Sequence, residues 1–241
     1  MKKVTIINHT NDMLAGIIDE NKDTKDIVIA CHGLWGNKNG VFYPQLSLAL
    51  AKSVNVLRFD FTGAGESSGT YWYGYSKDVE DIRAAIEYCR SHGYSVKAII
   101  GHSKAGTAVM LYAAKYNDVP YIVNLAGRFH PKEGITFSEK EIAEIKAKKY
   151  ITIQRKEKSF IVTDAAFQER LATDLRVVSG VKAEVLIVHG NKDDTIPVSD
   201  AKMFSKCIPH NTLEIIDGAD HLFTKHADKM SSIVTSWLDE R

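Results

Sequence analysis

One serine lies where an apolar run gives way to helix-forming residues, within the segment Ile99–Gly106. A tight strand-to-helix turn of this kind holds a serine hydroxyl out over the edge of a sheet, where it can act as a nucleophile. The turn requires small residues two positions before and two positions after Ser103, which here are Gly101 and Ala105. Glycine is usual at the second position, so Ala105 departs from the consensus by one methyl group. We predict that Ser103 is a nucleophile; a capping serine at an ordinary junction is the alternative.

A serine hydroxyl is a weak nucleophile that needs a base, and the base needs an acid to orient it. His221 lies in a glycine-containing loop after a predicted strand, and we prefer it to His226, which is expected inside the last helix. Asp193 lies in the loop after the preceding strand, and we prefer it to its neighbour Asp194. Serine, aspartate and histidine in this chain order fit one sheet whose loops open at a common edge.

The oxyanion formed during acyl transfer needs two hydrogen-bond donors. The backbone N–H of Lys104 is one expected donor, because it follows the serine at a helix N-terminus, where the dipole favours negative charge. The loop Cys31–Gly36 follows an early strand, and its glycines allow amides to turn inward, so Leu34 is the second expected donor. The Lys104 ammonium opposes the helix dipole. We therefore expect a nearby acid to pair with it, although the sequence does not indicate which one.

The segments that hold these residues alternate between strand and helix patterns. Strands are expected at Val4–Asn8, Leu14–Asp19, Ile27–Cys31, Val54–Phe59, Val96–Ile100, Tyr121–Leu125, Val185–Val188 and Leu213–Ile216. Helices are expected at Gln45–Ser53, Asp78–His92, Lys104–Tyr116, Ser199–Cys207 and Lys225–Leu238. Several strands are continuous apolar runs, typical of strands buried on both faces. The pattern predicts an α/β fold, a mostly parallel sheet with helices on both faces.

The alternation breaks between residues 128 and 179, a stretch too long for an ordinary connection. We expect a single domain, residues 1–241, with 128–179 inserted as a cap between core strands. A basic run in this segment, from Lys146 to Lys158, is interpreted as a solvated face, with steering of anionic substrates as the alternative. The aromatic cluster Tyr71–Tyr75 is interpreted as packed core or surface, with a place in the acyl pocket as the alternative.

The composition excludes several classes of protein. The 241 residues are 44% hydrophobic and 25% charged, as in ordinary globular proteins. With 31 basic and 30 acidic residues, the chain lacks the basic excess of a nucleic-acid-binding domain. It shows no apolar run long enough for a membrane span and no signal peptide, and its three cysteines suit a reducing compartment, so we expect a cytoplasmic protein. No metal-ligand spacing is present, and Gly63-x-Gly65 lacks the rest of a dinucleotide motif, so no cofactor is expected.

Five motifs occur in order along the chain: His32-Gly33-x-x-Gly36, Arg58–Ser67, Gly101-His102-Ser103, Gly190-x-x-Asp193 and Asp220-His221. Together they resemble the α/β-hydrolase superfamily, and most of all its small feruloyl/cinnamoyl esterases and serine aminopeptidase-like hydrolases. The similarity spans residues 14 to 238. It implies Ser103 as nucleophile, His221 as base and Asp193 as its orienting acid. It also implies Leu34 and Lys104 as oxyanion donors, and a substrate-binding lid at 128–179 with a helix over 138–150 and a hairpin over 151–162.

These features predict a serine esterase that works through an acyl-enzyme on small or medium acyl esters, or on hydroxycinnamoyl esters. The same triad serves an amidase or peptidase and a monoacylglycerol-type lipase, so these stay open as alternatives. A hydrolase-fold protein that binds a ligand without turnover is a further alternative. The expected partner is a small-molecule ester, without nucleic acid or membrane, and the sequence leaves a homo-oligomer open.

Overall fold

The computed structural model describes residues 1–135, 137–155 and 158–241, and everything below refers to these residues. Within them an eight-stranded sheet runs in the order β1-β2-β4-β3-β5-β6-β9-β10. Antiparallel pairing joins β1 to β2 and β2 to β4, and the remaining pairs are parallel. The bounds are β1 Lys2–Ile7, β2 Met13–Asp19, β3 Asp26–Cys31, β4 Asn55–Phe59, β5 Ser95–His102, β6 Tyr121–Leu125, β9 Glu184–Gly190 and β10 Asn211–Ile216. The predicted α/β fold with a mostly parallel sheet is confirmed.

The helices that cover the sheet are α1 Tyr43–Leu50, α2 Ser76–Ser91, α3 Lys104–Tyr116, α6 Val198–Cys207 and α7 Ala227–Asp239. The helix expected at Gln45–Ser53 starts two residues earlier, where Pro44 supplies a residue suited to a first helical turn. The prediction for His226 is wrong in detail, because α7 begins at Ala227 and His226 is the residue that precedes it.

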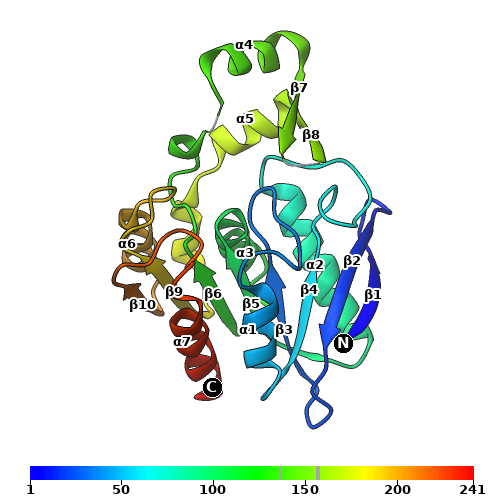
Figure 1. Cartoon of the computed structure of the whole chain (residues 1–241), viewed down its shortest axis with the longest axis vertical. Helices are drawn as coiled ribbons and strands as arrows, with labels where there is room; N and C mark the ends of the chain where they lie inside the picture. Colours follow the sequence, from blue (N-terminus) through cyan, green and yellow to red (C-terminus); the bar gives the residue numbers. More distant parts are fainter. Residues whose placement is uncertain (136, 156–157) are drawn as a thin grey trace.

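Side chains of β3 alternate between two apolar cores, one on each face of the sheet. Ile27, Ile29 and Cys31 pack with residues of α2 and α3, whereas Val28 and Ala30 pack with residues of α1 and α7. Figure 1 shows α1 and α7 next to each other along one side of the sheet. Both faces of β3 are covered by helices, so its residues from Ile27 to Cys31 are all buried and apolar. The strand therefore appears in the sequence as an unbroken hydrophobic run.

The segment between β6 and β9 rises from the carboxyl end of the sheet and forms the uppermost part of Figure 1. It holds a 3₁₀ turn, a helix, a hairpin, a second helix and another 3₁₀ turn: η1 Pro131–Gly134, α4 Glu139–Lys148, β7 Tyr150–Arg155, β8 Lys158–Thr163, α5 Asp164–Ala172 and η2 Leu175–Gly180. Ser138 and Glu141 form a capping box at the start of α4. We call the part from α4 to α5 the cap.

The aromatic cluster Tyr71–Tyr75 forms the floor on which the cap packs. Tyr73 is fully buried in a separate small core with Phe137 and Phe167. Glu169 of α5 ties the two parts together: its carboxylate accepts hydrogen bonds from the Trp72 indole, from two backbone amides and from the Ser76 hydroxyl. The cluster is therefore mainly packed core. No helix in the described part of the chain has the length and apolar character needed to cross a membrane.

Candidate active site

Ser103 sits on a strained turn between β5 and α3. Its backbone angles are φ 57° and ψ −118°, a conformation that costs a non-glycine residue about 1–3 kcal/mol. The turn is held by a hydrogen bond from the Ser103 N–H to the carbonyl of Leu125 on β6, at 2.9 Å. A Cβ on Gly101 would lie 2.2 Å from the carbonyl oxygen of Ala105, so the turn excludes a side chain there. Ala105 itself is completely buried, and the turn therefore accommodates its methyl group.

The structure brings Ser103, His221 and Asp193 together from three loops. Nε2 of His221 lies 2.9 Å from the Ser103 Oγ, and Nδ1 lies 2.7 Å from Oδ2 of Asp193. Asp194 lies outside this chain of contacts, where its carboxylate accepts a hydrogen bond from the Thr195 hydroxyl. These distances are those of a nucleophile, a base and an orienting acid joined by hydrogen bonds.

Asp193 is fixed as an anion by the loop that carries it. Oδ1 accepts hydrogen bonds from the backbone N–H groups of Thr195 and Ile196, at 2.9 and 2.7 Å. Oδ2 lies 3.1 Å from Nε2 of His189 in addition to its contact with His221. Burial raises the pKa of the Asp193 carboxyl, but hydrogen bonds from His189, His221 and Ile196 outweigh it and hold the pKa well below its usual range. The carboxylate can thus stabilise a positive charge on His221.

The two expected oxyanion donors lie on either side of Ser103. Lys104 is the first residue of α3, so its N–H is one of the donors that a helix leaves without an internal partner. The Gly33 carbonyl accepts hydrogen bonds from Nδ1 of His32 and from the Gly36 N–H, at 2.9 and 3.1 Å. In a trans peptide the N–H of Leu34 points the opposite way. A Cβ on Gly33 would lie 3.0 Å from the Ser103 Cβ, so this peptide passes close to Ser103.

The Arg58–Ser67 motif supports the loop that carries Leu34. Asp60 is completely buried and forms an ion pair with Lys38 at 2.6 Å, while its oxygens also accept the backbone N–H groups of Lys38 and Glu66. Gly65 has φ +52°, and a Cβ there would overlap the Asp60 carboxylate. The motif therefore stabilises the loop that carries Leu34.

The Lys104 ammonium finds its acid in Asp78, the third residue of α2. The two groups lie 2.7 Å apart and both are almost fully buried. The ammonium also donates to the carbonyl of Trp72 at 2.7 Å. Burial raises the pKa of the Asp78 carboxyl to about 6, and the Lys104 charge only partly offsets this effect. Burial likewise lowers the pKa of Lys104. The sequence could indicate that an acid was needed but not which of several helix residues would face the turn.

Two histidines that the sequence analysis did not assign also contact the triad. Nε2 of His102 lies 2.8 Å from the backbone carbonyl of His221, and burial lowers the pKa of His102 to about 3, so the ring is neutral and donates this bond. His189 contacts Asp193 as described and Ile196 O at 2.9 Å. His102 is the last residue of β5, and His189 is the penultimate residue of β9. Their position at the carboxyl ends of strands that lead into the site is the one feature of the sequence that could have predicted these contacts.

A cavity of about 350 Å³ opens at the triad. Its walls come from the loops after β3 and β5, from the loop that carries His221, and from the end of β7 in the cap. The lining residues are His32, Gly33, Leu34, Trp35, Gly36, Asn37, Gly40, Val41, Tyr43, His102, Ser103, Arg155, Thr195, His221 and Leu222. This volume lies in the range of cavities that bind small molecules.

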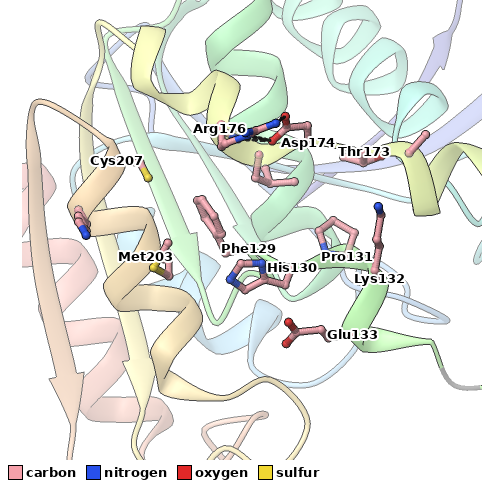
Figure 2. A pocket seen from close by; sticks show the side chains of 13 residues that line it. Phe129, His130, Pro131, Lys132, Glu133, Thr173, Asp174, Arg176, Met203 and Cys207 are labelled. Atoms are coloured by element: carbon pink, nitrogen blue, oxygen red, sulfur yellow. Dashed lines mark hydrogen bonds and ion pairs between the residues drawn. The ribbon is translucent and has the colours of Figure 1, made fainter.

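A separate cavity of about 730 Å³ lies between α6 and the 3₁₀ turns η1 and η2. Figure 2 shows Phe129, Met203 and His130 around it, with the Arg176–Asp174 ion pair at one side. It shares no lining residue with the cavity at Ser103 within the described part of the chain.

The sheet order, the turn at Ser103 and the three loops that meet there define an α/β-hydrolase. A sequence model of the serine aminopeptidase (S33) family matches residues 22–185. The chain belongs to this family of hydrolases.

Solved esterase structures share the fold. Est1E from Butyrivibrio proteoclasticus, in a structure with ferulic acid bound, superposes with a TM-score of 0.85 at 21% identity, covering 98% of each chain. The esterase domain of a Rhodothermus marinus protein gives 0.76 at 22% identity, covering 98% of this chain and 96% of that one.

Two curated proteins are similar to this chain in sequence. YqkD of Bacillus subtilis (strain 168) is 25% identical over 236 residues, which cover 90% of this chain and 72% of YqkD. YfhR of Salmonella typhimurium is 29% identical over 204 residues, covering 81% of this chain and 64% of YfhR. The chain thus spans less than two thirds of YfhR.

Proposed function

We propose that the protein is a serine esterase that hydrolyses small or medium carboxylic esters through an acyl-enzyme. The observation that carries the proposal is the continuous contact from the Ser103 Oγ through the His221 ring to Asp193, at 2.9 and 2.7 Å. The family membership and the esterase folds of the structural neighbours support it.

The mechanism follows from these contacts. The Ser103 oxygen attacks the ester carbonyl carbon while its proton passes to Nε2 of His221, and the N–H groups of Leu34 and Lys104 stabilise the oxyanion. Collapse of the tetrahedral intermediate breaks the bond to the alkoxide, which leaves with the proton from His221. A water molecule then attacks the acyl carbon while His221 accepts its proton. Collapse of this second tetrahedral intermediate breaks the bond to the Ser103 oxygen, which takes the proton back from His221, and the acid is released.

The substrate is proposed from the size of the cavity and from the cap. About 350 Å³ suits an ester of modest size. Est1E, whose structure was solved with ferulic acid bound, lends support to a hydroxycinnamoyl ester as one member of this class.

The test is hydrolysis of p-nitrophenyl acetate, butyrate and octanoate and of methyl ferulate by the purified protein and by Ser103→Ala. We expect turnover that is greatest for the shorter p-nitrophenyl esters and that falls to background in the variant. Activity retained by Ser103→Ala would contradict the assignment of the nucleophile.

A second proposed activity is cleavage of an amide bond, favoured by the serine aminopeptidase description of the family. An aminoacyl p-nitroanilide panel measured beside the esters separates the two activities. A higher kcat/KM on an anilide than on every ester would make the protein a peptidase.

A further inference from the structure

We propose that Arg155 recognises a carboxylate group on the substrate, so that the enzyme prefers negatively charged esters to their neutral isosteres. This inference rests on the proposed esterase function and specifies its substrate class. Arg155 is the last residue of β7, and it lines the same cavity as Ser103 and His221. The cap thereby adds a permanent positive charge to a wall of the cavity in which the ester would react.

An aromatic ring holds the Arg155 guanidinium in place. The guanidinium carbon lies 5.7 Å from the centroid of the Trp35 ring, within the range of a cation–π contact. Trp35 itself packs against Tyr71 and Phe160, at ring-centroid distances of 4.8 and 4.7 Å, and these two rings also contact each other at 5.0 Å. Nη1 of Arg155 donates to the carbonyl of Gln154 at 3.1 Å. Because the ring contact and this hydrogen bond restrict the guanidinium, its other donors can bind a ligand with less further loss of side-chain freedom.

Among the described residues, Arg155 has no carboxylate within ion-pair distance, and Glu141 of α4 interacts with its charge only from farther away. No Asp or Glu is found among the described residues that line the cavity. Two lysines close to the site are already neutralised, Lys38 by Asp60 and Glu66 and Lys104 by Asp78. A substrate anion would therefore meet attraction from Arg155 without repulsion from an acid in the cavity wall.

The lysines of α4 and its C-terminal end do not line the cavity as Arg155 does. Lys146, Lys148 and Lys149 are exposed on or just after α4 and do not line the cavity. Lys148 and Lys149 form ion pairs with Glu144 and Asp164. General attraction by the cap and specific recognition by Arg155 can thus be separated by substitution.

The experiment compares esters that differ only in charge. Monomethyl glutarate and methyl glutaramate carry the charge or its carboxamide replacement on the acyl side, and O-acetylglycolate and O-acetylglycolamide carry it on the alcohol side. The kcat/KM ratio within each pair is measured for the wild-type protein, Arg155→Gln, Arg155→Lys and the control Lys146→Gln, at low and high salt.

We expect the wild-type protein to prefer the carboxylate in at least one pair by roughly tenfold, as for a charge-assisted contact in a partly exposed site. Arg155→Gln should abolish this ratio, chiefly through KM. Arg155→Lys should keep part of it, because the charge stays and the planar fork is lost. Lys146→Gln should keep the wild-type kcat/KM ratio. High salt should reduce this ratio in the wild-type protein. Equal rates within both pairs for the wild-type protein, or a ratio that Arg155→Gln and Lys146→Gln reduce alike, would overturn the inference.

Failure of this inference is distinct from failure of the proposed function. Turnover of p-nitrophenyl butyrate with no charge preference leaves the esterase proposal standing and removes the role of Arg155. If no ester of either charge is hydrolysed and a fluorophosphonate fails to label the protein, both proposals fall together.

Discussion

The ring of His102 donates a hydrogen bond from Nε2 to the backbone carbonyl of His221, at 2.8 Å. The residue before the proposed nucleophile thus holds the loop that carries the proposed base. The bond joins β5 to a loop 119 residues further along the chain, so that two members of the triad are positioned relative to each other by a group that takes no part in proton transfer.

His102→Leu removes this donor, and we expect kcat on p-nitrophenyl butyrate to fall about tenfold with little change in KM. His102→Gln, whose amide can donate in place of the ring, should recover part of the loss, which a role in packing alone would not produce. Thermal unfolding of both variants serves as the control for folding. A folded His102→Leu protein with kcat within a factor of two of the wild-type value would refute this positioning role.

The same histidine makes stability depend on pH. Burial lowers the pKa of His102 from 6.5 to about 3, so the unfolded chain binds a proton that the folded protein does not. The free energy of unfolding should therefore fall as the pH falls from 6.5 towards 3, by about 1.4 kcal/mol per pH unit for this one group. His32, whose pKa burial lowers to about 4, acts in the same direction. Asp78 acts in the opposite direction, because its pKa is raised to about 6 and its ionisation above that pH opposes folding.

Urea unfolding at several pH values between 4.5 and 6.5 isolates the contribution of His102. The slope of the unfolding free energy against pH should be smaller for His102→Gln than for the wild-type protein by about 1.4 kcal/mol per pH unit. His210→Gln, the same substitution at an exposed position, is the matched control. An unchanged slope in His102→Gln would mean that His102 is not buried in its neutral form.

The Lys104–Asp78 pair should be costly to break and less costly to replace. Lys104→Met leaves a buried carboxylate without its partner, and we expect the protein to lose about 3–5 kcal/mol of stability. The double variant Lys104→Met/Asp78→Asn removes both charges and should recover a large part of that loss. Chemical denaturation of the two single variants and of the double variant gives the coupling energy. Additive effects would contradict a direct interaction.

The turn at Ser103 should tolerate change at one of its small residues and not at the other. Gly101→Ala places a Cβ against the Ala105 carbonyl, so we expect loss of ester turnover or of the folded protein. Ala105→Gly restores the consensus residue in the first turn of α3 and should keep turnover, at a cost of up to about 1 kcal/mol in stability. Expression, thermal unfolding and ester turnover are measured for both. Full activity in Gly101→Ala would show that the turn is looser than its geometry indicates.

The sequence predicted the sheet and the triad contacts well because both depend on local patterns. Each of these patterns lies within one short segment of the sequence. They are the apolar runs, the serine between a strand and a helix, and the aspartate and histidine after later strands. β6 and α3 have the predicted bounds, Tyr121–Leu125 and Lys104–Tyr116. Ser103, His221 and Asp193 then meet because the carboxyl ends of parallel strands share one edge of the sheet.

The supporting contacts could not be predicted, because they join residues far apart in sequence through side-chain directions. Asp78 faces Lys104 from another helix, and Glu169 reaches the Tyr71–Tyr75 segment from the cap. In the sequence, Arg155 is one of several basic residues that all look solvent-exposed. Only the fold of the β7–β8 hairpin places Arg155, and not Lys146, at the cavity that contains Ser103. Such contacts depend on how the insertion folds back over the sheet.

Covalent labelling of Ser103 is the most direct test of the proposed mechanism. The protein is incubated with a fluorophosphonate, the adduct is located by peptide mass spectrometry, and residual ester turnover is measured in the same samples. We expect one adduct per chain, on Ser103, with turnover lost in proportion to labelling, and no adduct at this position in Ser103→Ala. Labelling at another residue that accompanies the loss of turnover, or full turnover after Ser103 is modified, would contradict the mechanism.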